Sequence, residues 1–160
     1  MEYQININYQ FTAESETEAK DKAKNYVGNN LEVKAMKDGV YSPLEIASKC
    51  KNFRKAKKEH FYVFFLDTQN RILGKETVSI GTLNTSLIHP RECFRTAILK
   101  NSASVIFVHN HPSGGLEPSA EDLTVTKRLV DAGKLLGIHV LDHVIVTTDS
   151  YTSFKERHLF

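Results

Sequence analysis

One short segment of the chain, residues 109–122, contains His109, His111, Ser119 and Asp122. His109 and His111 are one residue apart, so at the end of an extended strand both imidazoles lie on the same face. The prolines and glycines that follow favour a chain reversal, and Asp122, in the first turn of a following helix, can return to the same point. Two imidazoles and one carboxylate suit Zn²⁺ and leave a fourth position for water. An open position indicates a catalytic rather than a structural zinc site.

These residues also have structural explanations. A single histidine after a buried strand is usually a polar residue with its hydrogen bonds satisfied. The Ser119-x-x-Asp122 spacing is that of a helix capping box, and for this pair alone the cap is the favoured interpretation. A cap also fixes the start of the helix, and with it the direction of Asp122. Structural roles do not explain why both histidines, the loop and the carboxylate occur together.

Other common zinc patterns are absent from the sequence. Zinc deaminases need His-x-Glu followed by Pro-Cys-x-x-Cys, and many zinc proteases carry His-Glu-x-x-His on a helix. The only cysteines, Cys50 and Cys93, are too few and too far apart for a thiolate site or a disulfide framework. This usage favours a reducing, cytoplasmic location.

Composition excludes some classes of protein but does not name a partner. The formal charge is only +2, so no strong field favours nucleic acid or an anionic membrane. The amino terminus lacks the pattern of a signal peptide, and apolar runs such as Phe61–Leu66 are too short to span a membrane. We therefore expect a soluble protein without a membrane partner.

Several segments around these residues predict a mixed α/β domain. Phe61–Leu66 is apolar on both faces, as in a central strand. Further strands are expected over Ile72–Ile80, over Val105–Val108 up to His109, and over Ile138–Val146. Helices are expected from Ser42-Pro43 to about Lys58, from Pro90 through Lys100, and after Ser119, the last with an apolar face of Leu123, Val130 and Leu136 and a stop at Gly137.

The amino-terminal residues predict a short extension. Apolar and polar residues alternate over 3–11, which indicates a strand, and 12–30 is rich in helix formers. We therefore divide the chain into a strand-helix extension, residues 1–42, and a catalytic domain, residues 43–160.

A basic cluster lies at the end of the first predicted helix of the catalytic domain. It consists of Lys51, Arg54, Lys55, Lys57 and Lys58. The cluster could contact phosphate, but a solvated helix face is the favoured interpretation.

At this point the sequence resembles a known family. The spacing from His109-x-His111 through Ser119 to Asp122 is similar to the JAMM (MPN-plus) metalloprotease motif at every defined position. Residues of about 43–155 resemble the bacterial RadC branch. The matching segments are Glu59-His60-Phe61, Leu66-Asp67-Thr68-Gln69-Asn70, Gly81-Thr82-Leu83-Asn84, Pro90-Arg91-Glu92, His109 through Gly114, Pro118-Ser119, Leu135-Leu136-Gly137-Ile138 and Leu141-Asp142-His143.

The resemblance implies a cytidine-deaminase-like α/β sandwich, with a curved mixed sheet flanked by helices. It implies Zn²⁺ held by His109, His111 and Asp122, and hydrolysis of a peptide or isopeptide bond. Ser119 would help to stabilise the oxyanion, and an upstream glutamate would act through the water. That glutamate is Glu59 by this resemblance, with Glu76 as the rival.

The resemblance also leaves alternatives open. Longer RadC proteins carry an amino-terminal helix-hairpin-helix region associated with DNA binding, in place of the short extension predicted here. A nucleic-acid-associated accessory protein of DNA repair or mobile elements, acting by binding, is therefore the weaker hypothesis. His143 matches no ligand position, so it has either a structural role or a role behind the ligands. The sequence predicts neither the substrate nor the oligomeric state.

Overall fold

The computed structural model describes residues 42–81 and 88–160. The strand and helix predicted within the first 42 residues lie outside this part of the chain, as does the Thr82-Leu83-Asn84 segment of the family pattern. Those predictions remain predictions.

The described strands form one mixed sheet in the order β2-β1-β3-β4-β5. β1 pairs antiparallel with β2 and with β3, β3 and β4 are parallel, and β4 and β5 are antiparallel. The bounds are Glu59–Leu66 for β1, Ile72–Gly81 for β2, Ser104–Asn110 for β3, His139–Val146 for β4 and Tyr151–Ser153 for β5. The predicted central strand is confirmed, because β1 lies between two others. The short β5 was not predicted.

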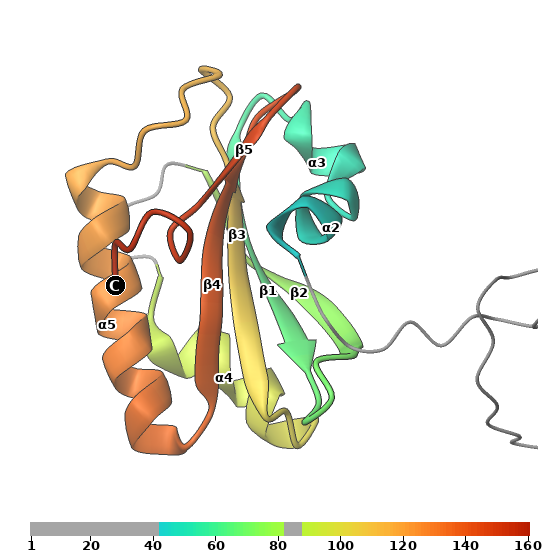
Figure 1. Cartoon of the computed structure of the whole chain (residues 1–160), viewed down its shortest axis with the longest axis vertical. Coiled ribbons are helices and arrows are strands. Elements are labelled where there is room, and N and C mark those ends of the chain that lie inside the picture. Colours follow the sequence, from blue (N-terminus) through green and yellow to red (C-terminus); the bar gives the residue numbers. More distant parts are fainter. Residues whose placement is uncertain (1–41, 82–87) are drawn as a thin grey trace, which may run out of the picture. The chain divides into compact units, whose positions relative to one another are not determined.

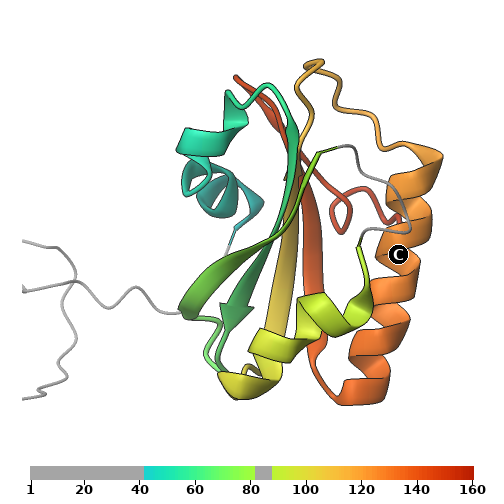
Figure 2. The same cartoon turned by 180° about the vertical axis from the view of Figure 1, so that it is seen from behind.

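Helices cover both faces of the sheet, which confirms the predicted α/β class (Figure 1). α2 and α3 lie on one face, whereas α4 and α5 lie on the other, as the reverse view also shows (Figure 2). Their bounds are Pro43–Ser48 for α2, Lys51–Arg54 for α3, Pro90–Leu99 for α4 and Ala120–Leu136 for α5. Within the described residues, no helix combines the length and the apolar character needed to cross a membrane.

The strand alternation divides the core into two apolar layers. Phe61, Val63 and Phe65 of β1 pack in the layer beneath α4 and α5. Phe64 and Leu66 pack in the layer beneath α2 and α3. Successive side chains of a strand point to opposite faces, so an odd-numbered position of β1 faces α4 and α5.

The first predicted helix is shorter than expected. α2 ends at Ser48, and the separate α3 ends at Arg54 rather than near Lys58. The amide Nδ2 of Asn110 donates to the carbonyl oxygens of Ala56 and Lys58, at 3.3 and 3.1 Å. Asn110 thereby holds the segment that leads from α3 into β1.

The predicted apolar face of α5 was wrong. Leu123 is 39% exposed and Leu136 is 46% exposed. The buried residues of this helix are Asp122, Val125, Thr126, Leu129 and Gly133. The buried face includes two polar residues and a glycine, whereas the large apolar residues Leu123 and Leu136 lie on the neighbouring face. A prediction from apolar residues therefore chose the wrong face.

Gly133 lets α5 approach the sheet closely. A Cβ atom at this position would lie 2.6 Å from the carbonyl oxygen of Ile138 and 3.1 Å from the side chain of Val140. In a helix interior, alanine is otherwise favoured over glycine by about 1 kcal/mol. The absence of a side chain therefore serves packing, not helix formation.

We expect Gly133→Ala to lower the free energy of unfolding by roughly 1–3 kcal/mol, the usual cost of overpacking. Urea unfolding of the metal-free chain measures this change. Leu135→Ala on the same helix is the control, because Leu135 is 89% exposed and should change stability by less than about 0.5 kcal/mol. A Gly133→Ala chain as stable as the original would show that the helix can move away without cost.

Candidate metal centre

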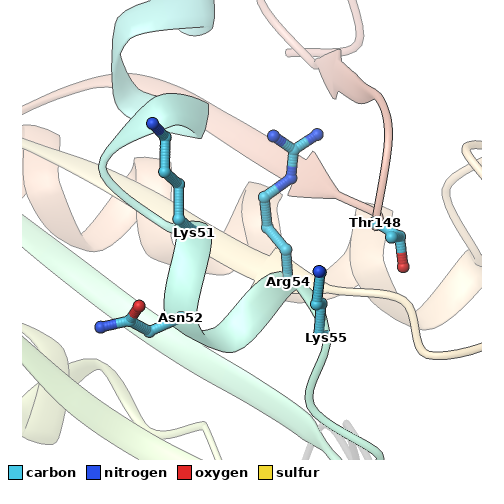
Figure 3. Close-up of a pocket in the computed structure, with 5 residues that line it drawn as sticks. All are labelled: Lys51, Asn52, Arg54, Lys55 and Thr148. Carbon is cyan, nitrogen blue, oxygen red and sulfur yellow. The ribbon is translucent and has the colours of Figure 1, made fainter.

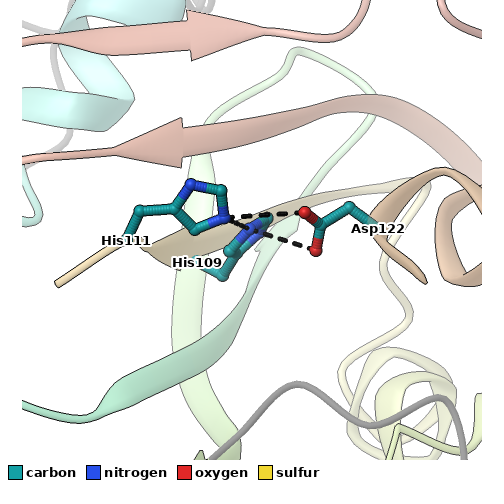
Figure 4. Close-up of side chains that lie close together, drawn as sticks. All are labelled: His109, His111 and Asp122. Atoms are coloured by element: carbon teal, nitrogen blue, oxygen red, sulfur yellow. Dashed lines mark hydrogen bonds and ion pairs between the residues drawn. The ribbon is translucent and has the colours of Figure 1, made fainter. Parts of the chain in front are cut away.

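The structure brings His109, His111 and Asp122 together (Figure 4). β3 carries His109, His111 follows directly after it, and Asp122 belongs to the first turn of α5. The Nε2 atoms of the two histidines are 3.0 Å apart. Asp122 places Oδ1 3.3 Å from Nε2 of His109 and Oδ2 3.5 Å from Nε2 of His111. One ligand atom of each residue lies within 4.8 Å of the others, so the group could hold a metal ion.

His111 has a defined protonation pattern in this geometry. Its Nδ1 lies 2.8 Å from the carbonyl oxygen of Gly115. A carbonyl only accepts hydrogen bonds, so Nδ1 carries the proton. In the neutral ring Nε2 is then a bare lone pair that points toward the group.

The carboxylate of Asp122 gives the group its negative charge. Burial alone would raise the pKa of Asp122, but the imidazoles of His109 and His111, which can donate to the carboxylate when they are protonated, outweigh burial and hold that pKa well below its usual range. Asp122 would accept a hydrogen bond from the protonated ring of His111, and this raises the pKa of His111. Burial lowers the pKa of His109, although Asp122 acts in the opposite direction. The carboxylate thus stays charged beside two imidazoles, an environment that attracts a cation.

Ser119 orients Asp122 in this structure. Both bonds of the capping box are present. The backbone N–H and the hydroxyl of Ser119 donate to Oδ2 of Asp122, at 2.8 and 2.7 Å, and the backbone N–H of Asp122 donates to Oγ of Ser119 at 3.0 Å. The cap and the candidate site therefore use the same atoms, as the sequence allowed.

Asn110, between the two histidines, points to the opposite face of the sheet. Besides its two donor bonds to the segment before β1, its Oδ1 accepts from the backbone N–H of His60 at 2.7 Å. Asn110 therefore fixes the backbone on both sides of Glu59. Sequence reasoning gave this residue no role, although the strand alternation already excluded it from the face of the histidines.

Glu59 lies on the same face as the candidate ligands. Phe61 pairs with His109 in the antiparallel register of β1 and β3, and continuing that register by two residues places Glu59 opposite His111. Its charge acts to raise the pKa of both histidines, although burial lowers the pKa of His109 overall. Glu76 pairs with Val63 instead, four residues along β1 from Glu59 and therefore about 13 Å away. Of the two rivals, Glu59 is the one placed beside the histidines.

His143 lies directly behind His109. Its Nε2 is 2.8 Å from Nδ1 of His109, and its Nδ1 is 2.6 Å from Oγ1 of Thr126. The side chain is fully buried, and this burial lowers the pKa of His143 well below its ordinary value. The sequence left the role of His143 open and gave no signal for Thr126.

The basic cluster lies on the other face of the sheet. An open pocket of about 450 Å³ there is lined by Lys51, Asn52, Arg54, Lys55 and Thr148 (Figure 3). The guanidinium of Arg54 donates to the carbonyl oxygens of Thr147 and Ser150, at 2.5 and 2.8 Å. Arg54 thus joins α3 to the loop after β4. The arginine of the basic cluster therefore has a structural role.

The mixed sheet, its two layers of helices and the His-His-Asp group are those of a JAB-type α/β domain with a candidate metal site. Residues 40–159 match the model of the RadC-like JAB domain family. The chain belongs to this family.

Similar proteins occur in archaea and bacteria. The UPF0758 protein of Methanosarcina acetivorans is 51% identical over 125 residues, which are 78% of this chain and 55% of that protein. The UPF0758 protein of Desulfitobacterium hafniense is 51% identical over 119 residues, 74% of this chain and 52% of that protein. A UPF0758 protein of Caldanaerobacter subterraneus is 48% identical over 130 residues, 81% of this chain and 53% of that protein. The chain therefore spans about half the length of the curated relatives it matches.

Proposed function

We propose that the chain is a zinc-dependent hydrolase that cleaves a peptide or isopeptide bond. The main support is the pair of Nε2 atoms of His109 and His111, which lie 3.0 Å apart beside the charged carboxylate of Asp122. Two lone pairs at this distance repel each other unless a cation lies between them or a proton is shared. The donor set of two imidazoles and one carboxylate is that of catalytic zinc.

His109, His111 and Asp122 would hold the ion and leave a fourth position for water or substrate. A bound Zn²⁺ lowers the pKa of water toward about 7 and polarises a carbonyl group. The side chain of His109 is 0% exposed, whereas that of His111 is 12% exposed. A substrate would therefore approach from the side of His111, where Glu59 also lies.

Glu59 is the proposed general base. Its carboxylate would take the proton of the attacking water and pass it to the leaving amine of the substrate. Support comes from its position opposite His111 and from its electrostatic effect on both histidines. Asn110 also holds the backbone on both sides of Glu59, which fixes the point from which this side chain extends.

Ser119 is proposed to support the developing negative charge on the carbonyl oxygen. Its hydroxyl donates to Oδ2 of Asp122 in this structure. To donate to the substrate, the hydroxyl must rotate away from the carboxylate, while the backbone N–H of Ser119 continues to hold Oδ2. The two roles of Ser119 would thus alternate.

We expect the zinc-loaded chain to cleave members of a mixed peptide library, including peptides with lysine-linked isopeptide bonds. Removal of the metal with a chelator should abolish cleavage, and added Zn²⁺ should restore it, because the proposed chemistry needs the Lewis acid. Mass spectrometry of the products gives the measurement. Cleavage that continues in the chelated chain, or no cleavage of either bond type by the loaded chain, would contradict the proposal.

A further inference from the structure

A chain of buried hydrogen bonds links two of the candidate metal ligands. It runs from Nδ1 of His109 to Nε2 of His143 at 2.8 Å, and from Nδ1 of His143 to Oγ1 of Thr126 at 2.6 Å. The last bond joins Oγ1 of Thr126 to the backbone carbonyl oxygen of Asp122, also at 2.6 Å. The chain begins on the ring of one ligand and ends on the backbone of another.

The carbonyl end fixes the direction of every bond in this chain. A carbonyl oxygen only accepts, and two oxygens 2.6 Å apart need the hydroxyl proton between them. Oγ1 of Thr126 is then an acceptor toward His143, so Nδ1 of His143 carries a proton. In a neutral ring, Nε2 of His143 is therefore an acceptor, and Nδ1 of His109 is the donor.

The surroundings of His143 keep its ring neutral. The side chain is fully buried, and its ring packs against Phe154, Phe61 and Phe107 with centroid separations of 4.5, 5.5 and 6.2 Å. Apolar surroundings disfavour an imidazolium ion. A charged His143 would also direct an N–H at His109 and force the proton of His109 onto Nε2, the atom that faces Asp122.

We infer that His143 and Thr126 are positioning residues that fix the tautomer of His109, so that its Nε2 lone pair points at the metal. This inference rests on the metal site proposed above. His143 and Thr126 touch neither metal nor substrate; they act through His109 and through the start of α5.

The position of His109 within the sheet explains why side chains are needed here. His111, beyond the end of β3, is fixed directly by the backbone carbonyl of Gly115. His109 lies inside β3, which is hydrogen-bonded to β1 on one side and β4 on the other. Neighbouring carbonyls serve the sheet ladder, so the acceptor for Nδ1 of His109 comes from a side chain of β4.

Thr126→Val and Thr126→Ser form a matched pair that tests this inference. Valine keeps the shape of threonine but removes the hydroxyl, whereas serine keeps the hydroxyl. We expect Thr126→Val to weaken zinc binding about 10–100-fold, the usual effect of removing a partner behind a ligand. Thr126→Ser should bind zinc almost as tightly as the original chain. Competition with a chromophoric chelator measures the affinity, and circular dichroism of the metal-free chains checks the fold.

A second pair acts at His143 itself. In His143→Gln the side-chain oxygen can take the place of Nε2 and accept from His109, whereas His143→Leu offers no acceptor. We expect the glutamine variant to bind zinc more tightly than the leucine variant.

Nitrogen-15 NMR of the histidine rings in the zinc-loaded original chain shows directly which ring nitrogen of His109 carries the proton. This measurement does not depend on the folding of a variant. The inference predicts that Nδ1 of His109 carries the proton. A proton on Nε2 of His109, or a Thr126→Val chain that binds zinc as tightly as the original, would overturn the inference alone. An original chain that does not bind zinc would overturn the proposed function as well.

Discussion

Replacing Asp122 by alanine is expected to abolish stable zinc binding. Asp122 supplies the charge of the three-residue group, and its two oxygens lie 3.3 and 3.5 Å from the histidine nitrogens. Loss of a ligand should exceed the roughly 10–100-fold effect of losing a partner behind one. The zinc content of each chain after dialysis, determined by atomic emission, gives the measurement.

The same helix offers a matched control for this replacement. Asp131 is 61% exposed and faces Lys134 at 3.7 Å, so Asp131→Ala removes an equal charge from α5 without touching the site. It should retain the zinc of the original chain. His111→Ala is the companion variant, because Asp122→Ala also breaks the capping box whereas His111→Ala does not. If both Asp122→Ala and His111→Ala kept their full zinc content, the proposed zinc site would be wrong.

The candidate ligands could be predicted because their geometry is local. An alternating strand places His109 and His111 on one face, and a cap at Ser119 directs Asp122, so short-range rules are enough. The apolar strands were found for the same reason. The face of α5 was missed because Asp122 and Thr126 are buried for their hydrogen bonds and Gly133 for its lack of a side chain.

Contacts between distant segments could not be predicted in this way. Asn110 bonds to Ala56 across 54 positions, and His109 bonds to His143 across 34. Each pairing depends on strand order and register, which one sequence does not specify. The same limit left Glu59 and Glu76 as rivals, since only the register of β1 with its two neighbours shows which glutamate lies opposite His111.

Because this register places Glu59 opposite His111, replacing Glu59 should strongly reduce the rate of cleavage. We expect Glu59→Gln to reduce zinc-dependent peptide cleavage by a factor of about 10²–10⁴, the usual contribution of a general base, with zinc content unchanged. Glutamine keeps the size and polarity of glutamate but cannot take a proton from water. The rate of cleavage per zinc-loaded chain, on a peptide that the original chain cleaves, is the quantity to compare.

Glu76→Gln is the control, because it makes the same chemical change on the same face of the sheet, on the neighbouring strand β2 and about 13 Å from Glu59. It should leave the rate close to that of the original chain. An active Glu59→Gln chain would exclude Glu59 as the base. An inactive Glu76→Gln chain would favour Glu76 as the base. Loss of zinc from Glu59→Gln would instead make Glu59 part of the metal site, since a base that acts only on the water does not hold the ion.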